Sequence, residues 1–174
     1  MARVKEAFAG RGLKATEYRG QTTIVAPPEL THELLKFLRD DEALAYDFLS
    51  DLYGVDYEGY PAETPGRFGV GYNLVSTRDN RRIYVKTYVS PSKPTDGTEA
   101  DPALEMDSVC DLWPAAEWME REVYDLFGVR FRNHPDLRRI LLWEDYPGHP
   151  LRKDYPLRGR GEREHFKVID RSDA

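Results

Sequence analysis

The sequence has one cysteine, Cys110, and no apolar run long enough to cross a membrane. A single thiol excludes a disulfide within the chain, and it excludes an iron–sulfur cluster or a structural zinc held by thiolates alone. A membrane-spanning helix needs about 20 mainly apolar residues, so the chain is not expected to cross a bilayer. The first residues also lack the apolar stretch of a signal peptide, which predicts a cytoplasmic location.

Patterns that carry catalysis are scarce as well. No glycine-rich loop joins a strand to a helix, because Gly69 and Gly71 lie inside a strand pattern. His134 and His149 are each followed by proline and have no second ligand at metal-binding spacing. Cys110 has no neighbouring histidine or basic residue that would lower its pKa. The sequence therefore predicts neither a catalytic group of residues nor a bound metal.

The chain does have the composition of a globular protein. Its 174 residues are 40% hydrophobic and 32% charged, which suits one domain with a core of its own. The net charge of −6 is uneven, since residues 1–128 carry −9 and residues 129–174 carry +3. A basic C-terminal part on an acidic body indicates a segment that binds an acidic surface, although a solvated surface gives the same pattern.

The first half of the sequence predicts an α+β fold. A strand over residues 22–26 ends at Pro27, and Thr31 is expected to cap a helix of leucines at helical spacing. A second apolar set over residues 43–52 follows, and residues 55–60 alternate like a strand.

The clearest strand signal is a hairpin. Residues 68–74 and 83–89 alternate apolar and polar side chains, and Asp79 and Asn80 supply a turn between them. We therefore expect a small mixed or antiparallel sheet of three or four strands, with helices packed on one face and a polar opposite face.

Two predicted segments divide the second half of the chain. Residues 91–107 are acidic and have almost nothing to bury, which predicts a mobile loop. Residues 114–127 predict a helix that ends at Gly128. Residues 1–128 are then the core domain, and residues 129–174 form an extended basic segment that packs on a partner.

The predicted helix has three kinds of face. Five residues are expected to face the core: Ala115, Met119, Val123, Leu126 and Phe127. Trp118, Glu122 and Asp125 form a second stripe, which suits a protein interface with an aromatic anchor or a partly covered tryptophan.

The sequence makes separate predictions for the charged residues of this helix. Glu120 is expected to be charged and solvated, because it and Glu122 project to different sides of the helix. Arg121 can pair with Asp125 one turn later, and we expect its guanidinium to bridge to the turn at residues 134–136.

Three motifs close together in the second half carry a family resemblance. Residues 117–128 read E-W-M-E-R-E-V-Y-D-L-F-G, residues 134–139 read H-P-D-L-R-R, and residues 149–156 read H-P-L-R-K-D-Y-P. In this order they closely resemble the C subunit of proton-pumping NADH:quinone oxidoreductase, respiratory complex I. The resemblance implies interface positions for the following motif residues: Trp118, Glu120, Arg121, Glu122, Asp125, His134, Asp136, Arg138, Arg139, His149, Arg152, Lys153, Asp154 and Tyr155.

The resemblance implies a part of an enzyme complex without catalytic residues of its own. Such a part lies in the peripheral arm, on the cytoplasmic side of the cell membrane, beside the D subunit that forms the quinone site and near the B subunit. It binds no cofactor itself, because FMN, the iron–sulfur clusters and quinone belong to partner subunits. It reaches the membrane only through the complex.

Two other interpretations stay open at this point. The same motifs resemble the equivalent part of membrane-bound [NiFe]-hydrogenases and of F420H2- or ferredoxin-linked dehydrogenases. A different class is a single-stranded nucleic-acid platform built from Tyr155, Arg158, Arg160 and Phe166, with aromatic stacking and phosphate contacts. The carboxylates interspersed among these arginines weigh against nucleic acid.

Overall fold

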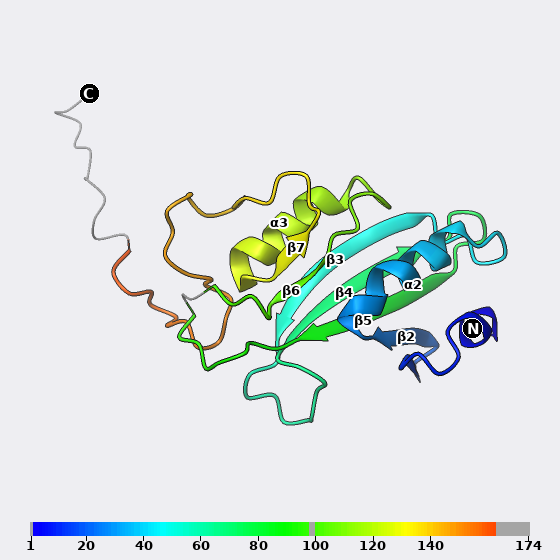
Figure 1. Cartoon of the computed structure of the whole chain (residues 1–174), viewed down its shortest axis with the longest axis horizontal. Helices are drawn as coiled ribbons and strands as arrows, with labels where there is room; N and C mark the ends of the chain where they lie inside the picture. Colours follow the sequence, from blue (N-terminus) through cyan, green and yellow to red (C-terminus); the bar gives the residue numbers. More distant parts are fainter. Residues whose placement is uncertain (1, 98–99, 163–174) are drawn as a thin grey trace.

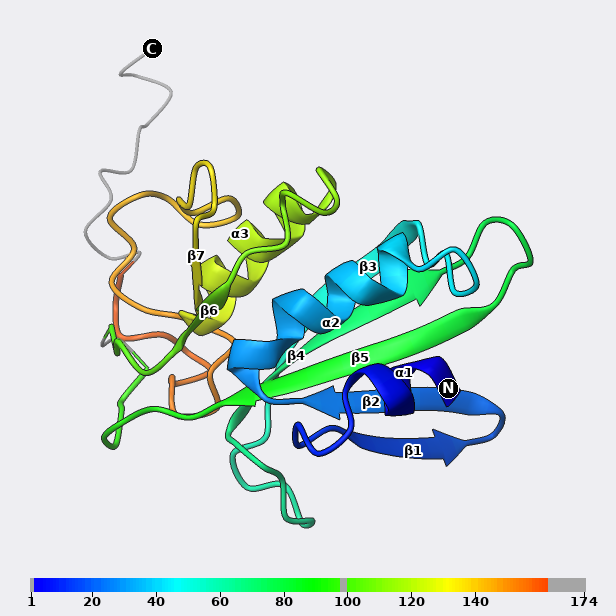
Figure 2. The same ribbon diagram turned by 45° about the vertical axis from the view of Figure 1, so that its right-hand side comes forward.

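The computed structural model describes residues 2–97 and 100–162. A twisted sheet forms one layer, and Figures 1 and 2 show the three helices of this part of the chain on the same side of it. The elements in chain order are α1 (Ala2–Ala7), β1 (Lys14–Tyr18), β2 (Gln21–Ala26), α2 (Pro28–Asp40), β3 (Phe48–Asp56), β4 (Phe68–Val75), β5 (Arg82–Val89), β6 (Glu105–Asp107), α3 (Ala116–Phe127) and β7 (Arg130–Arg132). The predicted α+β class is confirmed.

Within the described residues, the main sheet has five strands in the order β1-β2-β5-β4-β3. Strands β2 and β5 are parallel, and the other neighbouring pairs are antiparallel. A separate parallel pair, β6 and β7, joins two segments that flank α3. None of the described helices is long and apolar enough to span a membrane.

The predicted hairpin is confirmed as β4 and β5. Phe68 pairs with Val89 at one end of this ladder, and Val75 pairs with Arg82 at the other. Asn80 adopts φ 60 in the turn, a left-handed conformation that asparagine tolerates better than most residues. The inward-facing side chains of this hairpin form the centre of the core.

Helix α2 begins earlier than predicted. Pro28 occupies its first turn, where a missing N–H costs nothing, and Pro27 stands at the N-cap. Thr31 lies inside the helix, and its hydroxyl donates to the Pro27 carbonyl at 2.9 Å. The threonine therefore packs on the first turn and does not cap it.

Strand β3 begins before the predicted one. The sequence pattern predicts a strand over residues 55–60, whereas β3 starts at Phe48 and ends at Asp56. The pairing with β4 shifts between Leu49 and Asp51, which marks a β-bulge. The extra residue places Leu49 and Leu52 on the same inward face although they are three apart, a spacing that imitates a helix.

The predicted loop over residues 91–107 ends in ordered, buried structure. Leu104 and Met106 are fully buried, and β6 pairs with β7 along its whole length. Asp101 is also buried, and it accepts hydrogen bonds from the backbone and the hydroxyl of Ser92. The expectation that this segment has almost nothing to bury is wrong.

Helix α3 lies directly against β3. Gly54 faces the ring of Phe127, and a Cβ atom at this glycine would come within 2.6 Å of that ring. The missing side chain is therefore what allows the C-terminal end of α3 to approach the sheet.

We predict that Gly54→Ala destabilises the chain by about 1–3 kcal/mol, because the added methyl overpacks the contact with Phe127. The measurement is urea unfolding at equilibrium. The double variant Gly54→Ala with Phe127→Leu should recover part of the loss, since the smaller side chain vacates the space. Equal losses with and without Phe127→Leu would contradict this packing argument.

Candidate interaction surface

The segment after β7 is fastened to the chain's own domain. We name residues 133–157 the strap; it has no regular helix or strand, and Figure 1 shows it running beside α3. His149, Arg152 and Tyr155 of the strap are all buried in the chain alone. The predicted extended segment, residues 129–174, therefore packs on the chain's own domain over the part described. Its packing on a partner stays a prediction, and residues 163–174, with Phe166, lie outside the described part.

Asp125 of α3 is the main anchor of the strap. Its side chain is fully buried, and Oδ2 accepts three backbone N–H groups, from Ile140, Leu141 and Leu142, at 2.8–3.0 Å. Oδ1 accepts the guanidinium of Arg139 at 2.6 Å. Burial alone would raise the pKa of Asp125, but these hydrogen bonds outweigh burial and hold the pKa below its usual value. Asp125 therefore does not face a partner as predicted.

Arg139 also binds two other parts of the strap. Besides Asp125, its guanidinium donates to the carbonyls of Tyr146 and Gly148 at 2.7 and 3.0 Å. One fork of fixed geometry thus joins α3 to two separate turns of the strap.

A second group of charges fastens the far end of the strap to the sheet. Arg67 donates to Asp56 and to Asp154, each at 2.9 Å. Asp56 also accepts the backbone N–H of Lys153 at 2.8 Å, and Thr95 donates its hydroxyl to Asp154 at 2.6 Å. Burial opposes ionisation of Asp56, but these donors keep its pKa below the usual value.

The middle of the strap closes over the end of α3. His149 donates through Nδ1 to the Asp125 carbonyl at 2.9 Å, and Arg152 donates through Nε to the Phe127 carbonyl at 2.7 Å. Both side chains lie against Gly128 (φ 75), and a Cβ atom added at this glycine would lie 2.7 Å from the imidazole. Burial lowers the pKa of His149 to about 4, so the ring is neutral.

Arg121 does not bridge to the turn at residues 134–136 as predicted. Its guanidinium donates to the carbonyls of Arg138 and Arg139, at 3.1 and 3.0 Å. The carboxylates that were expected to bind it, Asp125 and Asp136, pair with Arg139 and Arg138 instead. Arg121 therefore joins α3 to the strap further along the chain than predicted, through backbone oxygens.

Glu120 faces inward, which corrects the expectation of a solvated carboxylate. The inward stripe of α3 differs from the predicted one, and its members include Ala116, Glu120, Val123 and Phe127. Glu120 accepts the backbone N–H of Val109 at 2.7 Å, which anchors the loop before the helix. Burial raises the pKa of Glu120 to about 7.

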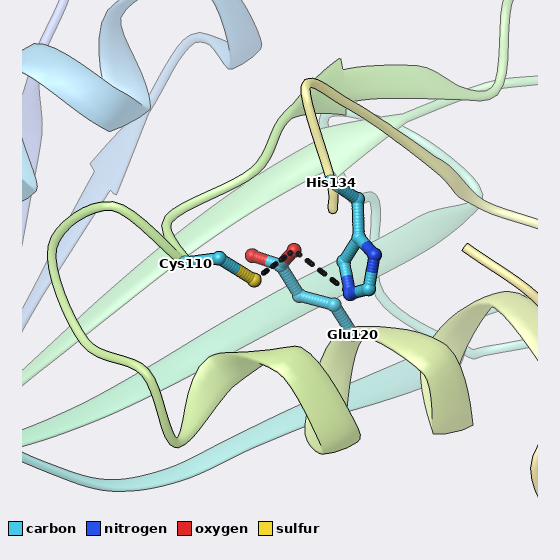
Figure 3. A group of neighbouring side chains, drawn as sticks. All are labelled: Cys110, Glu120 and His134. Carbon is cyan, nitrogen blue, oxygen red and sulfur yellow. Dashed lines mark hydrogen bonds and ion pairs between the residues drawn. The ribbon is translucent and has the colours of Figure 1, made fainter. Parts of the chain in front are cut away.

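Figure 3 shows Cys110 and His134 beside Glu120. The Cys110 thiol donates to Glu120 at 3.5 Å, and His134 Nε2 lies 4.0 Å from the same carboxylate. His134 Nδ1 accepts the Asp136 N–H, so Nε2 carries the proton and donates to the Glu117 carbonyl at 3.0 Å.

This is the one cluster of metal-ligand type among the described residues. Thiolate, carboxylate and imidazole are donors that zinc accepts. Here the three groups are joined to each other and to the backbone, and burial raises the pKa of Cys110 to about 12. The arrangement works as a hydrogen-bonded tie between two loops and α3, and the absence of a resident metal remains a prediction. Sequence spacing does not reveal the cluster, because His134 is far from Cys110 and Glu120 in sequence and only the turn after β7 brings it back to α3.

The outer side of α3 and the strap together form an exposed apolar surface. Trp118 is 65% exposed, Leu141 62% and Leu151 52%. The backbone N–H of Leu141 donates to Asp125, and the N–H of Leu151 donates to the Leu126 carbonyl, so both leucines line the helix. We call these three side chains, together with the other exposed large apolar residues of the strap, Trp143 and Leu157, the α3 surface.

The predicted interface residues separate into two sets. Those that point inward, and that hold the strap or, for Glu120, the loop before α3, are Glu120, Asp125, His134, Arg139, His149, Arg152, Asp154 and Tyr155. Those that stay at or near the surface are Trp118, Arg121, Glu122, Asp136, Arg138 and Lys153. Sequence reasoning missed the exposed leucines and the role of Arg67, because neither has a signal beyond its residue type.

Comparisons with known proteins agree with the motifs. The family model described as "Respiratory-chain NADH dehydrogenase, 30 Kd subunit" matches residues 24–161. A protein from Citrifermentans bemidjiense, named as the C subunit of NADH-quinone oxidoreductase, is 47% identical over 96% of this chain and 93% of its own length. NADH-quinone oxidoreductase subunit 5 of Thermus thermophilus is 46% identical over 79% of this chain and 63% of its own length.

Two solved structures have a similar fold. A trypsin-resistant fragment of Nqo5 is 36% identical, with a TM-score of 0.61, over 78% of this chain and 98% of the fragment. A chain of an archaeal membrane-bound sulfane sulfur reductase has a TM-score of 0.71 over 98% of this chain and 91% of its own. The second is 22% identical, so that likeness concerns the fold alone.

We predict that Asp125→Asn destabilises the chain by about 3–5 kcal/mol, because it removes one partner of a buried ion pair and leaves Arg139 without its carboxylate. Urea unfolding measures the loss, and limited trypsin digestion should cut the strap faster. The matched control is Asp136→Asn, which breaks an exposed pair with Arg138 and should cost at most about 1 kcal/mol. Similar losses in the two variants would show that Asp125 is no anchor.

Glu120 should make stability fall as pH rises. Its folded pKa is about 7 against an ordinary 4.5, so the folded chain binds more protons than the unfolded chain between these values. The free energy of unfolding of the parent should therefore drop, relative to Glu120→Gln, by about 3 kcal/mol from pH 4.5 to 7. Parallel pH profiles for parent and variant would contradict a raised pKa.

Proposed function

The chain belongs to the family of the 30-kDa subunit of respiratory-chain NADH dehydrogenase, and we propose that it acts as the C subunit of an NADH-quinone oxidoreductase. The observation that carries the proposal is where the residues of the family motifs lie in the structure. The motif residues Asp125, Arg139 and Arg152 make contacts that fix the strap on α3. Two apolar motif residues, Trp118 and Leu151, are exposed on the α3 surface.

The role is structural. The buried acids and bases of the motifs make hydrogen bonds to backbone groups. These residues therefore shape a surface and are not arranged around a substrate cavity. The electron transfer from NADH to quinone would use FMN, iron–sulfur clusters and quinone bound by partner subunits. This chain would hold the peripheral arm together on the cytoplasmic side of the membrane.

The α3 surface is the part that we expect to meet a partner. Trp118 is a large aromatic side chain that projects from the helix, with the guanidinium of Arg121 5.9 Å from its ring. Tryptophan and arginine are among the residues that most often anchor protein interfaces. We expect the D subunit, which forms the quinone site, to cover this surface, with the B subunit nearby.

We predict that Trp118→Glu prevents assembly and leaves the isolated chain folded, because the side chain is exposed in the free chain and a carboxylate would be buried in the interface. The measurement is co-purification of the other subunits from cells in which the variant replaces the native chain, with the Tm of the isolated variant as a check on folding.

The matched control is Lys36→Glu, which places the same charge on the outer face of α2 and breaks only an exposed pair with Asp40. It should assemble like the parent. Normal assembly and NADH:quinone activity with Trp118→Glu would exclude the α3 surface as the interface.

A further inference from the structure

The face of the main sheet opposite the helices is a second surface of unusual composition. The described helices lie on one side of the sheet, and none of them covers the other side (Figures 1 and 2). Among the described residues, the exposed large apolar side chains outside the α3 surface belong here: Tyr18 and Phe48 lie on its strands, and Tyr60 packs on Tyr57 at its end. We call this the open face.

Tyrosines dominate the open face. The strand register places Tyr53 of β3 opposite Gly71 of β4, and it places Tyr88 of β5 opposite Gly69. A Cβ atom at Gly71 would come within 2.8 Å of the Tyr53 hydroxyl oxygen, so the missing side chain lets the ring lie across the strand. Tyr57 lies over Gly69 in the same way, at 2.8 Å. The result is a surface of aromatic rings with hydroxyl groups, a composition typical of protein interfaces.

Lys86 stands among these tyrosines. Its ammonium donates to the Tyr57 hydroxyl at 2.9 Å and lies 5.5 Å from the centre of that ring. Although burial opposes the charge, the hydrogen bond to Tyr57 holds the pKa of Lys86 above its ordinary value, so the group is a cation. Among the described residues, no carboxylate lies within 4.0 Å of it. The open face therefore presents a half-buried positive charge with unused donors.

The charged side chains of the strands around Lys86 are mainly basic. Alternation along the strands places Lys14, Arg82 and Lys86 on the open face, and Asp51 is the one acidic side chain of the described strands there. The chain as a whole has a net charge of −6, so this excess of cations is local. Such a surface favours an acidic partner, because carboxylates supply both the charge and the acceptors that it lacks.

We propose that the open face is a second docking surface, on which an acidic segment of a neighbouring subunit places a carboxylate against Lys86 and the tyrosine hydroxyls. The proposal rests on the proposed function, since it takes the partner from the same complex. The chain then lies between two neighbours, with one on the α3 surface and one on the open face.

Site-specific photo-cross-linking in the assembled complex tests this placement. Benzoylphenylalanine replaces Tyr84, which shares the open face with Lys86, or Trp118 on the α3 surface, or Lys36 on α2 as a control. We expect position 84 to cross-link to an Asp- or Glu-rich segment of another subunit and position 118 to a different segment. Position 36 should give no product.

Charge variants then test Lys86 itself. Lys86→Gln should lower the cross-linking yield from position 84 at least fivefold, Lys86→Arg should restore it, and Lys36→Gln should leave it unchanged. The Tm of each variant shows whether it is folded, and Lys86→Arg keeps the test informative if Lys86→Gln is not.

Three outcomes would overturn the proposal. The first is a complex that cross-links from position 118 and not from position 84, which leaves the proposed function intact. The second is a cross-link from position 84 whose yield does not depend on Lys86. The third is binding of a single-stranded oligonucleotide that Lys86→Gln abolishes, which would assign the open face to nucleic acid. A chain that joins no complex would remove both the proposed function and this inference.

Discussion

The buried carboxylate of Asp125 holds the strap in place on α3. Three successive backbone N–H groups of the strap donate to one oxygen of Asp125, and the guanidinium of Arg139 donates to the other. A strap without helix or strand cannot satisfy its own backbone groups, so it needs side-chain acceptors at fixed points. Asp125 supplies one such point on α3, and Asp56 supplies the other at the end of β3.

The exposed apolar side chains depend on this anchoring. Leu141 is held outward because its own N–H is bound to Asp125, and Leu151 is held beside the helix by the Leu126 carbonyl. Hydrophobic side chains on a free, flexible segment would collapse or vary in position. On a fixed strap they form one surface before any partner arrives, which lowers the entropy lost on binding.

How much the sequence could predict depended on whether the signal was local. The β4–β5 hairpin and the end of α3 at Gly128 follow from alternation and from glycine's access to positive φ, and both were predicted. The start of β3 was missed because a bulge changes the period. Asp125 and Glu120 were placed on the outside because helix periodicity cannot tell that a strap or a loop will cover that side. The charged motifs were identified as important, but the direction of Glu120 and Asp125 depended on contacts 11 to 17 residues away in sequence.

The central claim is that the strap is already fixed in the free chain and presents the α3 surface to a partner. Amide hydrogen exchange on the isolated chain tests it most directly, at Ile140, Leu141 and Leu142. We expect these three amides to be protected in the free chain nearly as well as in the assembled complex, because Asp125 binds them in both. Fast exchange in the free chain, with protection only in the complex, would show that a partner and not Asp125 holds the strap.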